Sequence, residues 1–231
     1  MKDKFNFNQK TLKFVHESNY EKENLVKSSC NNIAINFIEK WPNWSADNRI
    51  VCIFGATGSG KTHIARVWKK KSNAKILNNI SNLTLNNIYE INTPLVFEDI
   101  NSNIYWPENL LFEFINEIKL SENYLLITCK GNPNKIKWNL KDLISRFSSF
   151  VNIEIKLPDD NLIKKILVKQ FADRQFSIEK KLIEYISLRI ERSYLAINNI
   201  VNLIDELTLK YKKPVNLSIV KEALSILNFK S

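Results

Sequence analysis

The sequence predicts an α/β domain with a parallel sheet, followed by a small all-helical domain. Two observations carry this prediction. Short apolar runs of strand length alternate with helical patterns up to about residue 157, and only helical patterns follow Pro158. Strands separated by helices pair in parallel and carry helices on both faces of the sheet. The inner apolar runs lack polar alternation, which is typical of strands buried on both sides.

Each element has its own local signal. The candidate strands are Ile50–Phe54, Ala74–Leu77, Leu95–Phe97, Tyr124–Ile127 and Phe150–Ile155. The candidate helices are 33–41, 61–71, one opened by Pro107, one capped by Asp159, and 178–190, 195–209 and 217–227. Proline suits a first helical turn, and aspartate suits an N-cap. We therefore divide the chain into an N-terminal arm over 1–20, an α/β domain over 21–157 and a helical domain over 158–231.

The segment Gly55–Thr62, which reads GATGSGKT, follows the first candidate strand and precedes a helix. This is the phosphate-loop pattern in the strand–loop–helix context that it requires. Three of the four glycines of the chain lie in it, because glycine lets successive N–H groups point at phosphate oxygens. Lys61 is a candidate to bind the β- and γ-phosphates, and the Thr62 hydroxyl to bind Mg²⁺. The candidate nucleotide-binding residues of this segment are Gly55, Thr57, Gly58, Ser59, Gly60, Lys61, Thr62 and His63. A glycine-rich turn without a ligand is the alternative interpretation.

Polar residues at two further strand ends extend the candidate site. Glu98 and Asp99 directly follow Leu95–Phe97. We assign Glu98 to the water shell of Mg²⁺ and Asp99 to the orientation of an attacking water. Thr128 closes the next apolar run, and carboxyl ends of parallel strands face the ligand crevice. Thr128 is therefore a candidate contact for the γ-phosphate or the water, although a plain strand residue fits equally well.

Composition limits the remaining function classes. The formal net charge is +10, but lysine is enriched along the whole chain, which favours a solvated basic surface and only weak or indirect contact with DNA. The three cysteines lie far apart, which disfavours disulfides and zinc. The N-terminus lacks a signal-peptide core and no apolar run has the length of a membrane span. We expect a cytoplasmic protein without a membrane partner.

Together these motifs resemble the AAA+ ATPases, and within them the Hda-type branch of the DnaA family. The resemblance extends over nearly the whole chain, and its most specific strings lie in the helical domain. The segments that carry it are Phe37–Trp44, Leu157–Asp160, Phe171–Gln175 and Arg189–Tyr194. It implies that the five candidate strands form one sheet in the order 5-1-4-3-2 and that the helical domain is a lid over adenine.

The resemblance also implies a role and further site residues. Hda-type proteins bind ADP or ATP, dock on the DNA polymerase sliding clamp, and promote hydrolysis of ATP bound to the replication initiator DnaA. They lack the DNA-binding domain of DnaA, and a chain ending at Ser231 fits that expectation. The resemblance implies that Arg146 is an arginine finger acting in trans and that turnover by the chain itself is weak or absent. From local sequence alone, Arg146 also fits an ordinary surface charge.

Three positions depart from the pattern of the family. The clamp-binding motif Q-L-x-L has its nearest match around Phe5 and Phe7, without the glutamine. The lid arginine that senses the nucleotide aligns with Leu195, and Arg192, about one helical turn earlier, is its candidate substitute. Cys30 lies where many relatives have Asn, so Leu25 and Val26 are the candidate adenine contacts, through backbone and packing. Two other functions stay open: an autonomous DNA-associated ATPase or loader, and a non-catalytic clamp or DNA adaptor. Self-association also stays open.

Overall fold

A computed structural model describes residues 25–80, 93–100 and 106–228. They contain a five-stranded parallel sheet in the order β2-β3-β4-β1-β5, which is the predicted order read from the other edge. The strands are β1 (Ile50–Phe54), β2 (Lys75–Leu77), β3 (Leu95–Phe97), β4 (Leu125–Cys129) and β5 (Val151–Glu154). The predicted fold class is therefore confirmed.

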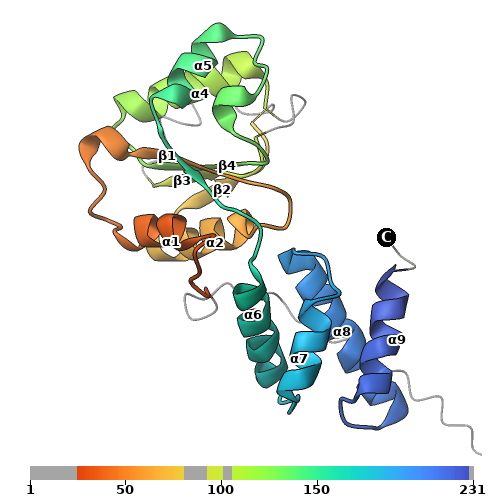
Figure 1. Cartoon of the computed structure of the whole chain (residues 1–231). Coiled ribbons are helices and arrows are strands. Elements are labelled where there is room, and N and C mark those ends of the chain that lie inside the picture. The colour runs from red at the N-terminus through yellow and green to blue at the C-terminus, as the bar shows by residue number, and fades with distance from the viewer. Residues whose placement is uncertain (1–24, 81–92, 101–105, 229–231) are drawn as a thin grey trace, which may run out of the picture.

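Helices cover both faces of the sheet, as Figure 1 shows. They are α1 (Asn32–Glu39), α2 (Lys61–Ser72), α4 (Glu108–Leu120) and α5 (Lys141–Ser148). Successive residues of β1 point to opposite sides of the sheet. Val51 and Ile53 belong to the buried cluster that contains residues of α1 and α2, whereas Ile50 and Cys52 belong to the cluster with α4 and α5. Burial on both faces explains why the inner strands are continuous apolar runs.

The short helix α5 is an element that the sequence analysis did not predict. It has 8 residues, too few for a clear helical period. Its apolar anchors Leu143 and Phe147 are both fully buried, and the ring of Phe147 stacks on Trp138 with centroids 5.2 Å apart. These contacts orient the helix so that Arg146 lies in its last turn.

The remaining helices form a separate bundle below the sheet in Figure 1. They are α6 (Asp160–Asp173), α7 (Lys180–Ser187), α8 (Tyr194–Tyr211) and α9 (Leu217–Asn228), and they share one buried apolar cluster. Asp159 caps α6 as predicted, because its Oδ1 accepts a hydrogen bond from the Leu162 N–H at 2.7 Å. The N-cap of α8 is Ser193, which the sequence analysis did not predict; its Oγ accepts from the Ala196 N–H at 3.0 Å. None of the described helices is long and apolar enough to cross a membrane.

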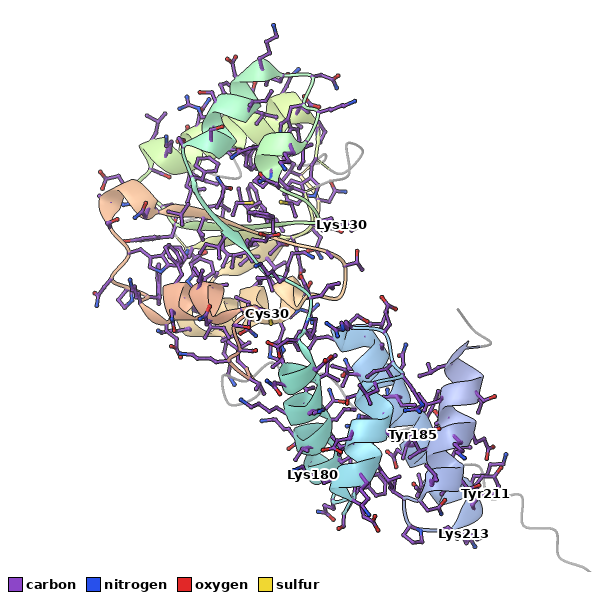
Figure 2. All side chains as sticks on the ribbon, viewed as in Figure 1. Cys30, Lys130, Lys180, Tyr185, Tyr211 and Lys213 are labelled. Carbon is purple, nitrogen blue, oxygen red and sulfur yellow. The ribbon has the colours of Figure 1, made fainter. Side chains whose placement is uncertain are left out.

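The segment before α1 contacts the helical domain as well as the α/β domain. Asp159 Oδ2 accepts hydrogen bonds from the hydroxyls of Ser28 at 2.6 Å and Ser29 at 3.0 Å. Val26 and Cys30 pack in the apolar cluster of the helical bundle, and Figure 2 shows Cys30 where the two domains meet. The bundle therefore includes side chains from a segment that the sequence analysis assigned to the α/β domain.

We expect stability to depend on pH through Asp159. The hydrogen bonds from Ser28 and then from Leu162 hold the pKa of its carboxyl below the ordinary value. A carboxylate whose folded-state pKa is depressed contributes stability above its unfolded pKa of about 3.9, and this contribution is lost as pH falls through the folded value. Asp159→Ala should lower the free energy of unfolding at pH 7 by about 1 to 2 kcal/mol. Urea titrations from pH 7 to pH 3 measure both effects.

Asp159→Asn separates the charge from the cap, because asparagine also caps helices. Its unfolding free energy should fall less steeply than that of the wild-type protein below about pH 5. Identical pH profiles for the two proteins would contradict the role of the charge.

Candidate nucleotide-binding site

The phosphate loop connects the carboxyl end of β1 to the first turn of α2, at the edge of the sheet where parallel α/β folds bind ligands. Gly55, Gly58 and Gly60 have φ values of 155°, 78° and 99°, and Gly60 is the N-cap of α2. The N–H groups at the start of a helix have no partner within the helix. The loop therefore presents backbone donors and the positive end of the α2 dipole at one place, which suits an anionic ligand.

Two side chains of the loop fit a bound phosphate. Lys61 is buried, and its Nζ donates to the carbonyl oxygens of Gly55 and Ala56, each at 2.8 Å. Burial lowers the pKa of Lys61, and the charge of Asp99 opposes that shift. Ser59 Oγ is buried and has no hydrogen-bond partner among the described residues. Because buried hydroxyls normally have a partner, this orphan at the phosphate loop fits a polar ligand.

The start of α8, in the helical domain, contacts the phosphate loop. The Tyr194 N–H donates to the Gly58 carbonyl oxygen at 3.0 Å. A Cβ on Gly58 would lie 2.6 Å from the Cβ of Ser193, and a Cβ on Gly60 would lie 2.9 Å from the Tyr194 ring. Burial raises the pKa of Tyr194 to about 12. Two glycines of the loop therefore also permit close contact between the domains. Sequence reasoning missed Ser193 and Tyr194 as neighbours of the loop, because no local pattern reports a contact between segments so far apart.

The acidic end of β3 lies beside the end of β4. Glu98 Oε1 is buried without a hydrogen-bond partner in the described part of the chain. The Asp99 N–H donates to Thr128 Oγ1 at 3.0 Å, and Asp99 Oδ2 lies 3.2 Å from Lys130 Nζ. Lys130 carries a signal that the sequence analysis did not use: it directly follows an apolar strand, as Glu98 does.

The position predicted for Thr128 needs a correction. Thr128 does not close its strand, because β4 continues to Cys129 in register with Phe54 of β1. Thr128 is 1% exposed and its hydroxyl oxygen holds the backbone of Asp99. A threonine hydroxyl retains one donor, so a contact from Thr128 to a ligand stays a prediction.

The candidate magnesium ligands come from different elements of the α/β domain. Thr62 is exposed in the first turn of α2, and Glu98 follows β3. The described residues contain no group of three or more His, Cys, Asp or Glu side chains that could hold a metal ion. A magnesium ion in such sites takes a few protein oxygens together with phosphates and waters. The two residues fit that arrangement only with a nucleotide present.

The other predicted residues are spread around the two domains. Thr57 is exposed on the loop, and His63 is partly buried in α2. Leu25 packs against the α/β core and Val26 against the helical core. Phe5 and Phe7, the predicted clamp contacts, lie outside the described residues.

The two predicted arginines lie in different domains. Arg192 precedes α8 and forms an ion pair with Asp160 at 2.9 Å. Arg146 lies in α5, with its guanidinium 5.5 Å from the centroid of the Phe112 ring. Leu195, at the position of the missing lid arginine, is 61% exposed.

The structure has a phosphate loop at the carboxyl edge of a parallel sheet in the order β2-β3-β4-β1-β5, and a helical lid domain contacts that loop. This combination defines a P-loop fold of the AAA+ type.

No protein-family model matches the chain. Its sequence is similar to the chromosomal replication initiator protein DnaA of Ureaplasma parvum, with 29% identity over 217 residues that cover 81% of this chain and 46% of that protein. It is also similar to DnaA of Buchnera aphidicola, with 26% identity over 227 residues that cover 86% of this chain and 50% of that protein. The chain thus spans about half the length of these relatives.

Solved structures show the same likeness in three dimensions. Domain III of the Thermotoga maritima replication initiation protein DnaA matches with a TM-score of 0.76 and 17% identity, over 90% of this chain and 97% of that one. AMPPCP-bound DnaA from Aquifex aeolicus matches with a TM-score of 0.69 and 22% identity, over 80% and 65%. The Thermotoga maritima RuvB branch migration motor matches with a TM-score of 0.60 and 18% identity, over 77% and 61%. The chain therefore has a DnaA-like AAA+ fold.

Proposed function

We propose that the chain binds ADP or ATP with Mg²⁺ and acts as a regulator of chromosomal replication initiation. In this role it stimulates hydrolysis of ATP bound to the initiator DnaA, together with the sliding clamp, and turns over little ATP itself. The observation that carries nucleotide binding is the phosphate loop with buried Lys61 and the orphan hydroxyl of Ser59. The similarity to DnaA and the Hda-type strings of the lid support the regulatory role. The proposed role belongs to the cytoplasm.

Within the chain, the proposed task of the site is to hold the nucleotide. Backbone N–H groups of the phosphate loop bind the phosphates, and Lys61 exchanges its backbone carbonyl partners for phosphate oxygens, with which it forms stronger charge-assisted bonds. Bound Mg²⁺ supplies positive charge that neutralises the phosphates. Leu25 and Val26 are the proposed adenine contacts, and their packing against different domains supports a coupling between the base and the lid.

The proposed stimulation acts on another chain. Arg146 is partly exposed in the last turn of α5 and supported by the Phe112 ring. An arginine supplied by one protein to the phosphates bound by another stabilises the charge of phosphoryl transfer. The DnaA partner supplies the nucleotide in this proposal, and the arm around Phe5 and Phe7 docks on the clamp.

Lys61→Ala should weaken binding of ADP and ATP by about 100-fold, because a charge-assisted contact to phosphate is lost from a buried position. It should also abolish stimulation of DnaA-bound ATP hydrolysis. Calorimetric titration with ADP measures the first effect, and phosphate release from ATP-loaded DnaA on clamp-loaded DNA measures the second. Lys69→Ala, an exposed lysine in the last turn of the same helix, is the matched control and should behave as the wild type.

The same variants test the alternatives. A non-catalytic adaptor predicts that Lys61→Ala retains full function. An autonomous ATPase, favoured by the retained carboxylates Glu98 and Asp99, predicts rapid DNA-stimulated turnover by the chain alone. If the wild-type chain binds neither ADP nor ATP, the proposal is wrong.

A further inference from the structure

Lys130 is a second lysine, besides Lys61, at the carboxyl edge of the sheet, and Figure 2 labels it there. Strand β4 lies between β3 and β1, so Lys130 lies between the acidic strand end and the phosphate loop. Phe54 is in register with Cys129, and the Gly55 N–H donates to the Cys129 carbonyl oxygen at 3.3 Å. Gly55 and Lys130 therefore leave the sheet on neighbouring strands, whose spacing is about 4.8 Å.

The backbone of Asp99, the partner of Lys130, is held by a hydrogen bond. Asp99 has a φ of 55°, a left-handed conformation that is uncommon outside glycine. The hydrogen bond from its N–H to Thr128 Oγ1 supports this backbone. The Asp99 carboxylate then meets Lys130 Nζ at 3.2 Å. This is the one ion pair of Asp99 within the described residues.

The Asp99–Lys130 pair lies near enough to Lys61, the proposed phosphate-binding lysine, for both charges to affect its pKa. The charge of Asp99 raises the pKa of Lys61 and the charge of Lys130 lowers it, after the larger effect of burial. The side chains of Lys130 and Asp99 are 55% and 48% exposed. An ion pair this exposed is weak and is screened by salt, so it can be broken or kept at little cost.

We propose that Lys130 restrains ATP hydrolysis in this site by holding the Asp99 carboxylate. The inference rests on the proposed nucleotide site, in which Asp99 orients the attacking water. In hydrolysis the water oxygen bonds to the γ-phosphorus, and the bond from that phosphorus to the bridging oxygen of ADP breaks. One proton of the water stays on its oxygen, and the other passes to a second oxygen of the released phosphate. A carboxylate orients water through its lone pairs, and the ammonium group of Lys130 lies 3.2 Å from Oδ2, where it attracts the carboxylate away from a water. Lys130 is thus a positioning residue, and the chain keeps its nucleotide because Asp99 is engaged.

Single-turnover hydrolysis of labelled ATP by the full chain tests the restraint. Lys130→Ala should raise the rate about 3- to 5-fold, the scale of an exposed ion pair. Lys130→Ala/Asp99→Asn should lose that gain. Affinity for ADP should stay within about 2-fold, because the pair acts on the water and not on the phosphates. Lys135→Ala, an exposed lysine of the following 3₁₀ turn, is the matched control and should leave the rate unchanged.

A further readout addresses the pair itself. Raising salt should bring the wild-type rate toward that of Lys130→Ala, because exposed pairs are screened. An unchanged or lower rate in Lys130→Ala would overturn the inference. If ADP binds and requires Lys61 while Lys130→Ala has no effect, only this inference fails; if no nucleotide binds, the proposed function fails with it.

Discussion

Replacing Arg146 by alanine is expected to abolish stimulation of DnaA-bound ATP hydrolysis and to leave ADP binding by the chain intact. An arginine supplied in trans accelerates phosphoryl transfer by about 10³- to 10⁵-fold, so the stimulated rate should fall to that of DnaA alone. Binding should survive because Arg146 lies in α5 against Phe112, whereas the phosphate loop joins β1 to α2. Phosphate release from ATP-loaded DnaA, with the chain and clamp-loaded DNA added, measures the effect.

Arg189→Ala provides a matched control for Arg146→Ala. Arg189 also lies over an aromatic ring, 3.7 Å from the centroid of Tyr185, but it belongs to the helical domain. Its loss should leave the stimulation unchanged. Equal activity of Arg146→Ala and the wild type, or an equal loss in both variants, would refute the assignment of the arginine finger.

Gly55→Ala should cause the largest loss of stability at the site. An added Cβ would lie 2.1 Å from the carbonyl oxygen of Ile155, and that oxygen is backbone. Relief requires β1 and β5 to separate, although the Ile155 N–H donates to the Phe54 oxygen at 2.7 Å. We expect a loss of at least about 3 kcal/mol in the free energy of unfolding. For a chain of this size that loss corresponds to a fall in Tm of about 6 to 12 °C.

The chain contains its own control for a glycine-to-alanine change. A Cβ on Gly131 would meet no atom within 4 Å, so Gly131→Ala should alter stability by less than about 0.5 kcal/mol. Thermal melts without added nucleotide keep ligand stabilisation out of the comparison. A Gly55→Ala protein that melts with the Gly131→Ala protein would show that the loop backbone tolerates a side chain.

Much of the fold could be predicted because its signals are local. Ile50–Phe54 and Leu95–Phe97 are apolar throughout, and both strands are buried by helices on each face. Asp159 caps α6 through its own side chain, as its position before an apolar helical stripe predicts. Helix α5 was not predicted because its apolar period is short. Its anchors Leu143 and Phe147 are recognised only from their packing against Trp138 and the sheet.

The candidate site likewise has parts that local sequence predicts and parts that depend on tertiary contacts. By itself, the sequence determined the phosphate loop and the acidic strand end, because each is a contiguous run whose chemistry can be read from residue types. Only the tertiary structure decided that Tyr194 contacts that loop, that Thr128 holds the backbone of Asp99, and that Lys130 pairs with its carboxylate. These contacts join residues that are distant in the chain. The crossing order of parallel strands and the docking of the lid bring them together, and neither leaves a pattern in neighbouring residues.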